Sequence, residues 1–137
     1  MIKIGCAVAL VVLAGAAARA DGALAVGSTG DVAKDGIAIG TSINYKTSEA
    51  AEQAALEKCK DYKPAPKAAA QCRSVGSCKA ECYAISFDPK DGTPGAGWAM
   101  AATKALAEQR ATANCQITAG ESRRDFCRIE ESKCDEN

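Results

Sequence analysis

Apolar side chains alternate with polar ones in one early stretch of the chain. Ile37, Ile39 and Ile43 stand at even spacing between Gly36 and Asn44, which is typical of a strand with one buried face. Turn-forming glycine and aspartate residues bound several other short apolar stretches. These features predict further strands over residues 23–26, from Cys72, from Cys82, over 98–102 and over 127–134.

A second spacing predicts helices. Ala51, Ala55 and Cys59 follow one another at intervals of four, so they lie on one stripe of a helix. Ser48 is the expected N-cap of this helix, and Thr103 is the expected N-cap of a second helix that ends at about residue 114.

The two halves of the chain match in four blocks that occur in the same order. This order indicates an internal repeat, although the alanine-rich composition also favours chance matches. The blocks pair residues 52–59 with 108–115, 36–39 with 97–100, 23–26 with 83–85, and 72–75 with 127–129.

The repeat predicts the fold class. Each half, about 21–81 and 82–137, is expected to run strand, strand, helix, strand. Frequent alanine allows helices to approach a sheet closely. We therefore predict an α+β fold of two layers, with a mainly antiparallel sheet and two helices on one face, held by disulfides.

The first twenty residues resemble a secretory signal peptide. Lys3 precedes an uncharged apolar stretch over 4–18, and the residues 18–20 read Ala-Arg-Ala, an expected cleavage site before Asp21. A retained signal anchor is the alternative. We expect a single domain over 21–137 in the periplasm or outside the cell, with no membrane span after cleavage.

Charge and composition exclude several classes of function. Without Lys3 and Arg19 the chain keeps 15 basic and 17 acidic residues, and the basic ones form no stripe, so we expect no nucleic-acid partner. The sequence contains no histidine, the usual general base and metal ligand. We therefore expect no enzyme, no cofactor and no metal.

The cysteine spacing predicts disulfides. In each half one cysteine ends a helix and the next begins a strand, 13 residues apart in the first half and 12 in the second. Cysteines at the start of the second half and at the end of the last strand are left to close a third bridge. The expected pairs are Cys59–Cys72, Cys115–Cys127 and Cys82–Cys134.

Cys6 falls in the expected signal peptide and is not counted, so this assignment leaves Cys78 as a free thiol. It has three readings: a small buried side chain, a crosslink between two chains, or a partner for Cys82 or Cys134 in place of the pair above. A zinc site built from Cys72, Cys78 and Cys82 is a competing reading, which an oxidising compartment disfavours.

In its ordered cysteines and its Gly97-Trp98 pair, the chain resembles the DUF4189 family of small exported bacterial proteins. The resemblance covers almost all of residues 21–137. It implies the same compartment, fold and disulfides, but no mechanism. Members of the family usually have an aromatic residue near the position of Cys78, which favours a core position for this side chain.

Three residues form the candidate binding surface. Trp98 follows Gly95-Ala96-Gly97 and is read either as a stacking platform or as a core anchor equivalent to Ile37. Asp88 and Asp91 flank one turn, where they stabilise the turn, bind calcium or act as an acid–base pair.

The expected function is a non-enzymatic binding or interaction module that works as a monomer on an unknown protein or envelope ligand. The alternative is an inhibitor of a secreted or envelope hydrolase, which would insert the loops 88–97 or 120–125.

Overall fold

The computed structural model describes residues 21–79 and 81–135, and the side chains of residues 78 and 79 are outside this description. The expected signal peptide and the side chain of Cys78 therefore lie outside the described part. The strands are β1 (Asp21–Gly27), β2 (Ala38–Tyr45), β3 (Arg73–Lys79), β4 (Cys82–Phe87), β5 (Ala96–Ala101) and β6 (Arg128–Cys134). The helices are α1 (Val32–Asp35), α2 (Ser48–Lys60), α3 (Pro66–Ala69), α4 (Lys104–Ala119) and the 3-10 turn η1 (Arg124–Phe126).

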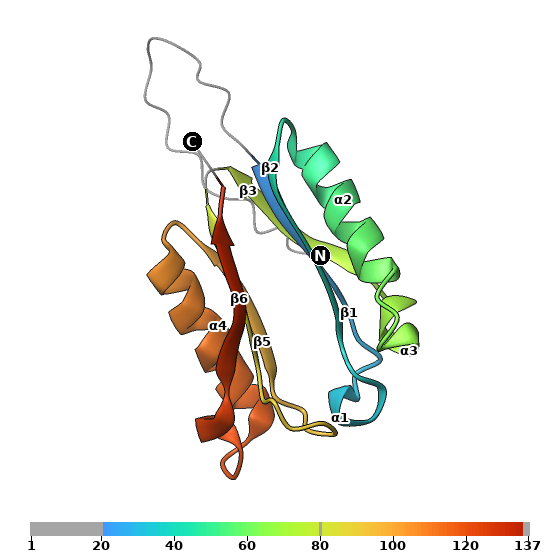
Figure 1. The fold of residues 1–137 in the computed structure, drawn as a ribbon, viewed down its shortest axis with the longest axis vertical. Coiled ribbons are helices and arrows are strands. Elements are labelled where there is room, and N and C mark those ends of the chain that lie inside the picture. Colours follow the sequence, from blue (N-terminus) through green and yellow to red (C-terminus); the bar gives the residue numbers. More distant parts are fainter. Residues whose placement is uncertain (1–20, 80, 136–137) are drawn as a thin grey trace.

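The strands form two antiparallel sheets of three strands each. The first sheet has the order β2-β1-β3 and the second has the order β5-β4-β6. The α+β class and the antiparallel pairing are confirmed, but the strands divide between two sheets where the sequence analysis expected one. Helix α2 packs on the first sheet and α4 on the second, so the two helices lie on opposite outer faces (Figure 1).

The two halves share the order of their strands and long helices, and their registers match around Leu24 and Ile85. In each half the first strand is central, the second strand and the last strand are its neighbours, and the long helix lies between them in sequence. Leu24 of β1 lies opposite Thr41, and Ile85 of β4 lies opposite Trp98. These registers make Thr41 the counterpart of Trp98, whereas the sequence alignment had placed Ile37 there, because local similarity cannot fix a register.

Glycine lets each helix touch its sheet directly. A Cβ atom built on Gly40 would lie 1.9 Å from the carbonyl oxygen of Ala55, and one built on Gly97 would lie 2.2 Å from that of Ala111. Real Cβ atoms do not approach an oxygen so closely, so only glycine fits at these two positions. The layer of side chains between each long helix and its sheet is correspondingly thin.

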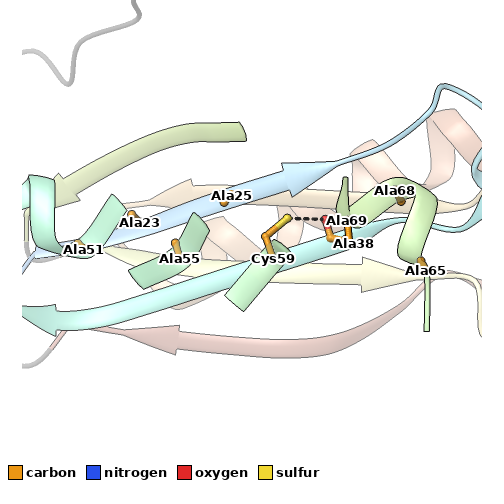
Figure 2. Packing of buried hydrophobic residues seen from close by; sticks show 9 residues of the cluster. All are labelled: Ala23, Ala25, Ala38, Ala51, Ala55, Cys59, Ala65, Ala68 and Ala69. Atoms are coloured by element: carbon orange, nitrogen blue, oxygen red, sulfur yellow. Dashed lines mark hydrogen bonds between the residues drawn. The ribbon is translucent and has the colours of Figure 1, made fainter. Parts of the chain in front are cut away.

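Alanine dominates that thin core. The first sheet and α2 bury a cluster in which every member is alanine or cysteine (Figure 2), and it comprises Ala23, Ala25, Ala38, Ala51, Ala55, Cys59, Ala65, Ala68 and Ala69. Methyl groups bury little area each, so these layers gain less hydrophobic stabilisation than a leucine-rich layer of the same extent.

The large apolar side chains lie between the two sheets instead. Leu24, Tyr83 and Ile85 form the buried centre of this layer, and Trp98 and Met100 pack against it partly buried. The molecule thus has four layers in the order α4, second sheet, first sheet, α2 (Figure 1).

Both long helices begin at a threonine. Thr103 Oγ1 accepts a hydrogen bond of 3.2 Å from the Leu106 N–H, as expected for an N-cap. At the first helix Thr47 performs this role for the Ala50 N–H. Ser48, the expected cap, instead donates its hydroxyl proton to Asp21 Oδ2 at 2.7 Å. The predicted N-cap, Ser48, is therefore one residue after the observed N-cap, Thr47.

Three disulfides join the same pairs that the sequence analysis expects. Cys59–Cys72 ties the end of α2 to the start of β3, with a Cα–Cα distance of 5.9 Å. Cys115–Cys127 ties α4 to the start of β6 at 6.1 Å, but α4 continues to Ala119, so Cys115 lies inside the helix and not at the end expected near residue 114. Cys82–Cys134 joins two directly opposed residues of β4 and β6. Cys72 and Cys82, two of the three cysteines of the alternative zinc site, are therefore both disulfide-bonded.

Candidate functional site

Edge strands β3 and β5 border an open groove of about 750 Å³ on one side of the molecule. We call it the Trp98 groove. Its walls come from β3, β5 and α4, and its main lining residues are Leu24, Val75, Gly76, Trp98, Met100 and Arg110. Sequence reasoning identified Trp98 but not the other residues, because the groove exists only where two sheets meet.

Trp98 joins this groove to two smaller hollows. One lies between β5 and α4 and includes Ile117, and the other lies beside Val75 and Arg73. Val75 is 42% exposed and Ile117 is 78% exposed. Exposed apolar side chains therefore adjoin a half-buried tryptophan on this side of the molecule. Trp98 is thus both a core contact and a surface residue.

Edge strand β5 is partly protected by the helix beside it. The Thr118 hydroxyl accepts a hydrogen bond from the Ala96 N–H, and it also lies 2.9 Å from the Ala96 carbonyl oxygen. The Asn114 side-chain amide donates to the Trp98 carbonyl oxygen at 3.0 Å. These contacts occupy the backbone groups that another strand would use. Strand β3 pairs with β1 alone among the described strands.

Charged side chains of both signs border the groove. Arg110 and Glu81 line the main groove, and Arg73 lines the hollow beside Val75. Neither arginine takes part in the ion pairs formed among residues 21–79 and 81–135. Their guanidinium groups are therefore available to an anionic group outside the chain.

The opposite side of the sandwich lies between β2 and β6. Beside it, the Tyr83 hydroxyl of β4 donates to Glu131 Oε1 of the neighbouring strand β6 in the same sheet. Burial, together with this carboxylate, raises the pKa of Tyr83, and the hydrogen bond lowers the pKa of Glu131. Nearby, the Asn44 N–H donates to Asp135 Oδ1 at 2.9 Å.

Two carboxylates at this end are buried with an unpartnered oxygen each. Asp21 Oδ1 and Asp135 Oδ2 have no hydrogen-bond partner within the described residues. Burial raises the pKa of Asp135, and the negative charge of Asp21 contributes to the same direction. Neither residue was singled out from the sequence, where nothing distinguishes them from surface aspartates.

Asp88 and Asp91 are not part of the groove. Arg123 binds Asp88 through two hydrogen bonds of 2.7 Å, and the Lys90 N–H donates to the same carboxylate. The Arg123 guanidinium holds the pKa of Asp88 well below its usual range. Asp88 therefore organises its turn, while Asp91 is exposed on the same turn. Both border a separate shallow hollow, which Trp98 does not reach.

Within residues 21–79 and 81–135, no group of three or more histidine, cysteine or carboxylate residues is placed to hold a metal ion. No helix in the same ranges has the length and apolar character needed to cross a membrane.

Comparison with known proteins gives a family but no relative of known activity. No curated protein and no solved structure matches the chain. A family model described as "Domain of unknown function (DUF4189)" matches residues 22–134, which include all six strands and both long helices. The chain belongs to the DUF4189 family.

Proposed function

We propose that this protein is an exported binding module whose ligand site is the Trp98 groove. The observation that carries the proposal is an open, largely apolar groove whose lining includes a half-buried tryptophan. Ligand sites are concave and mostly apolar, with a few polar groups that fix orientation.

The export part of the proposal is supported by the disulfides. Three disulfides lie within about 115 residues, and such bridges persist in oxidising compartments such as the periplasm or the exterior of the cell. The expected signal peptide points in the same direction. We expect the protein to act as a monomer without catalysis or cofactor.

Trp98 provides the test, because it is the only tryptophan of the chain. Oxidised protein would be titrated with short peptides, oligosaccharides and fatty acids, and binding would be followed by tryptophan emission. We expect at least one class to shift the emission of the natural protein. The variant Gly76→Val should lose this response, because a Cβ built on Gly76 meets no atom within 4 Å and its side chain would occupy open groove space.

Ser74→Val is the matched control for that variant. It adds the same side chain to the same exposed strand, but residue 74 does not line the groove. A ligand response that persists in Gly76→Val, or one that both variants lose equally, would contradict the groove as the site.

One observation favours the alternative, an inhibitor of a secreted or envelope hydrolase. The Asp88–Arg123 pair joins the two loops 88–97 and 120–125, and Arg123 also lies over the Phe126 ring at 4.0 Å. Loops fixed in this way lose little entropy when they bind an enzyme.

A panel of secreted proteases and glycosidases tests this alternative. Inhibition that Arg123→Gln weakens, but Lys67→Gln does not, would support it. Lys67 forms a comparable but more exposed pair with Asp35, so its variant controls for the loss of an ion pair. Inhibition unaffected by Arg123→Gln would locate the contact elsewhere.

A further inference from the structure

A pair of buried aspartates lies where the start of the first half meets the end of the second. Asp21 is 1% exposed and Asp135 is 7% exposed. We infer that the amino group released by cleavage before Asp21 is the cationic partner of these two carboxylates, so that removal of the expected signal peptide completes this site. The inference does not involve the Trp98 groove, and it rests on the export part of the proposed function.

Asp135 reaches from the second half onto the first strand of the first half. It follows β6, and its Oδ1 accepts a hydrogen bond of 2.9 Å from the Asn44 N–H of β2. A Cβ atom built on Gly22 would lie 3.0 Å from both oxygens of this carboxylate, so the carboxylate packs directly against the β1 backbone. It therefore lies beside the residue that directly follows Asp21.

Each of the two carboxylates has one oxygen that is held and one that is not. Ser48 donates to Asp21 Oδ2 at 2.7 Å and Asn44 donates to Asp135 Oδ1, whereas Asp21 Oδ1 and Asp135 Oδ2 have no hydrogen-bond partner within the described residues. Neither aspartate takes part in the ion pairs formed among residues 21–79 and 81–135. Burial, together with the Asp21 charge, raises the pKa of Asp135. Two neighbouring buried carboxylates without a cation oppose folding.

The sequence supplies a cation at this place once the chain is cut. Residues 18–20 read Ala-Arg-Ala, the expected recognition site of an export peptidase. Hydrolysis of the peptide bond between residues 20 and 21 consumes one water, leaves a carboxylate on Ala20 and gives Asp21 an amino group, which is protonated at neutral pH. Covalent geometry alone keeps this ammonium within about 5 Å of the Asp21 carboxylate.

Two chain starts test the inference. One protein is exported from the full chain and begins at Asp21. The other is exported from a full chain with Gly-Ser inserted between residues 20 and 21, so that its ammonium lies two residues farther away. Mass spectrometry confirms each start. We expect the equilibrium constant of unfolding at pH 7 to be about tenfold smaller for the protein that begins at Asp21. Equal constants would overturn the inference.

The pH dependence separates charge from fit. An α-amino group ordinarily has a pKa of about 8, and neighbouring carboxylates raise it in the folded state, so its contribution is complete below about pH 8 and is lost at higher pH. A difference between the two proteins that stays constant from about pH 6 to pH 10 would overturn the inference, because it would report only the bulk of the inserted residues. Other titratable groups on neighbouring segments are common to both proteins and cancel from the difference. They are Tyr45, Lys46, Glu49, Lys79 and Glu81.

Asp135→Asn locates the partner of the ammonium. Its amide oxygen can still accept from the Asn44 N–H, but most of the difference between the two chain starts should disappear. Asp125→Asn, which removes an exposed aspartate of the same half, is the matched control and should keep the difference. A difference that persists in Asp135→Asn would overturn the inference. A difference that Lys79→Gln removes instead would also overturn it, because residue 79 stands opposite Asp21 in β3.

Calcium provides a second check on the identity of the cation. The protein that begins at Asp21 should unfold at the same urea concentration with calcium and with a chelator. Stabilisation by calcium that Asp135→Asn removes would overturn the inference, because a metal ion would then occupy the place of the ammonium.

The outcomes separate this inference from the proposed function. If the full chain keeps residues 1–20 and stays in the cell, the export part of the proposed function and the inference fail together. If the chain is exported and cut before Asp21 but the two starts are equally stable, only the inference fails. Ligand titration of the Trp98 groove is independent of both results, since neither Asp21 nor Asp135 lines that groove.

Discussion

The two sides of the sandwich are built from equivalent strands, yet one is closed and the other is open. On the closed side, between β2 and β6, Tyr83 of β4 donates to Glu131 of the neighbouring β6, and the Asn44 N–H of β2 donates to Asp135, just after β6. On the open side, between β3 and β5, the corresponding space is the Trp98 groove. The backbone registers are the same on both sides, so the difference comes from a small number of side chains.

The strand registers show which exchange opens the groove. Ile85 lies opposite Glu131 of β6, and its counterpart Leu24 lies opposite Gly76 of β3. At this position the closed side has the Glu131 carboxylate, which accepts a hydrogen bond, whereas the open side has Gly76, which has no side chain. In a fold of two similar halves, different residues at a few inward-facing positions can thus give a packed contact on one side and an open groove on the other.

The largest expected effect concerns a feature that both halves share. Gly40→Val and Gly97→Val should each destabilise the oxidised protein by about 3 kcal/mol or more, because the added atoms would overlap helix backbone. Urea denaturation checks this. Gly76→Val is the control and should change stability little. A mild effect at one of the two positions would mean that the helices do not contact both sheets equally.

The Cys59–Cys72 and Cys115–Cys127 disulfides should contribute equally to the free energy of unfolding. Replacing Cys59 and Cys72 with alanine, or Cys115 and Cys127, should cost about 3 kcal/mol in each case, since the closed loops have similar lengths of 13 and 12 residues. Thermal denaturation of the two double variants measures the difference. A strong inequality would show that one half depends on its bridge and the other on its packing.

A smaller effect distinguishes the closed side from the open one. Tyr83→Phe should cost about 1 kcal/mol, because Glu131 loses a hydrogen bond while the ring still packs between the sheets. Trp98→Phe should change stability less than it changes ligand binding. Urea denaturation and calorimetric titration of both variants with a ligand of the natural protein provide the comparison, because the Trp98 variant has no tryptophan emission. Equal losses of binding would imply that both sides contact the ligand.

The smallest effect is expected in acid. The pKa of Asp88 is lowered in the folded state, so its pair with Arg123 stabilises the fold above the unfolded pKa of about 3.9, and this contribution is lost as the pH falls below that value. Arg123→Gln should therefore flatten the fall in stability between about pH 5 and pH 2. Urea midpoints measured across this range test the sign. A steeper fall in the variant would contradict it.

Much of this architecture follows from short-range patterns in the sequence. The helix stripe of Ala51, Ala55 and Cys59 is buried as its spacing predicts, and the cysteine intervals lead to the three bridges found among the described side chains. Both signals are local: a stripe and a short loop depend on neighbouring residues alone.

The division into two sheets and the groove could not be predicted in the same way. Both depend on which strand faces which across the molecule, and the alternation of Ile37, Ile39 and Ile43 says only that one strand face is buried. The misplacement of Ile37 as the counterpart of Trp98 has the same cause. That Gly76 of the first half is equivalent to Glu131 of the second half can be recognised only once the strand registers are known.

The distribution of the described disulfides has a mechanical consequence. Cys59–Cys72 lies within the first half, while Cys115–Cys127 and Cys82–Cys134 lie within the second. None of these three bridges joins the two sheets, so between residues 21 and 135 the sheets are held to each other by the apolar layer around Leu24 and Ile85 and by the backbone that connects β3 to β4. If that layer separated, each sheet would stay covalently fastened within itself or to its helix, and the chain would open as two intact halves.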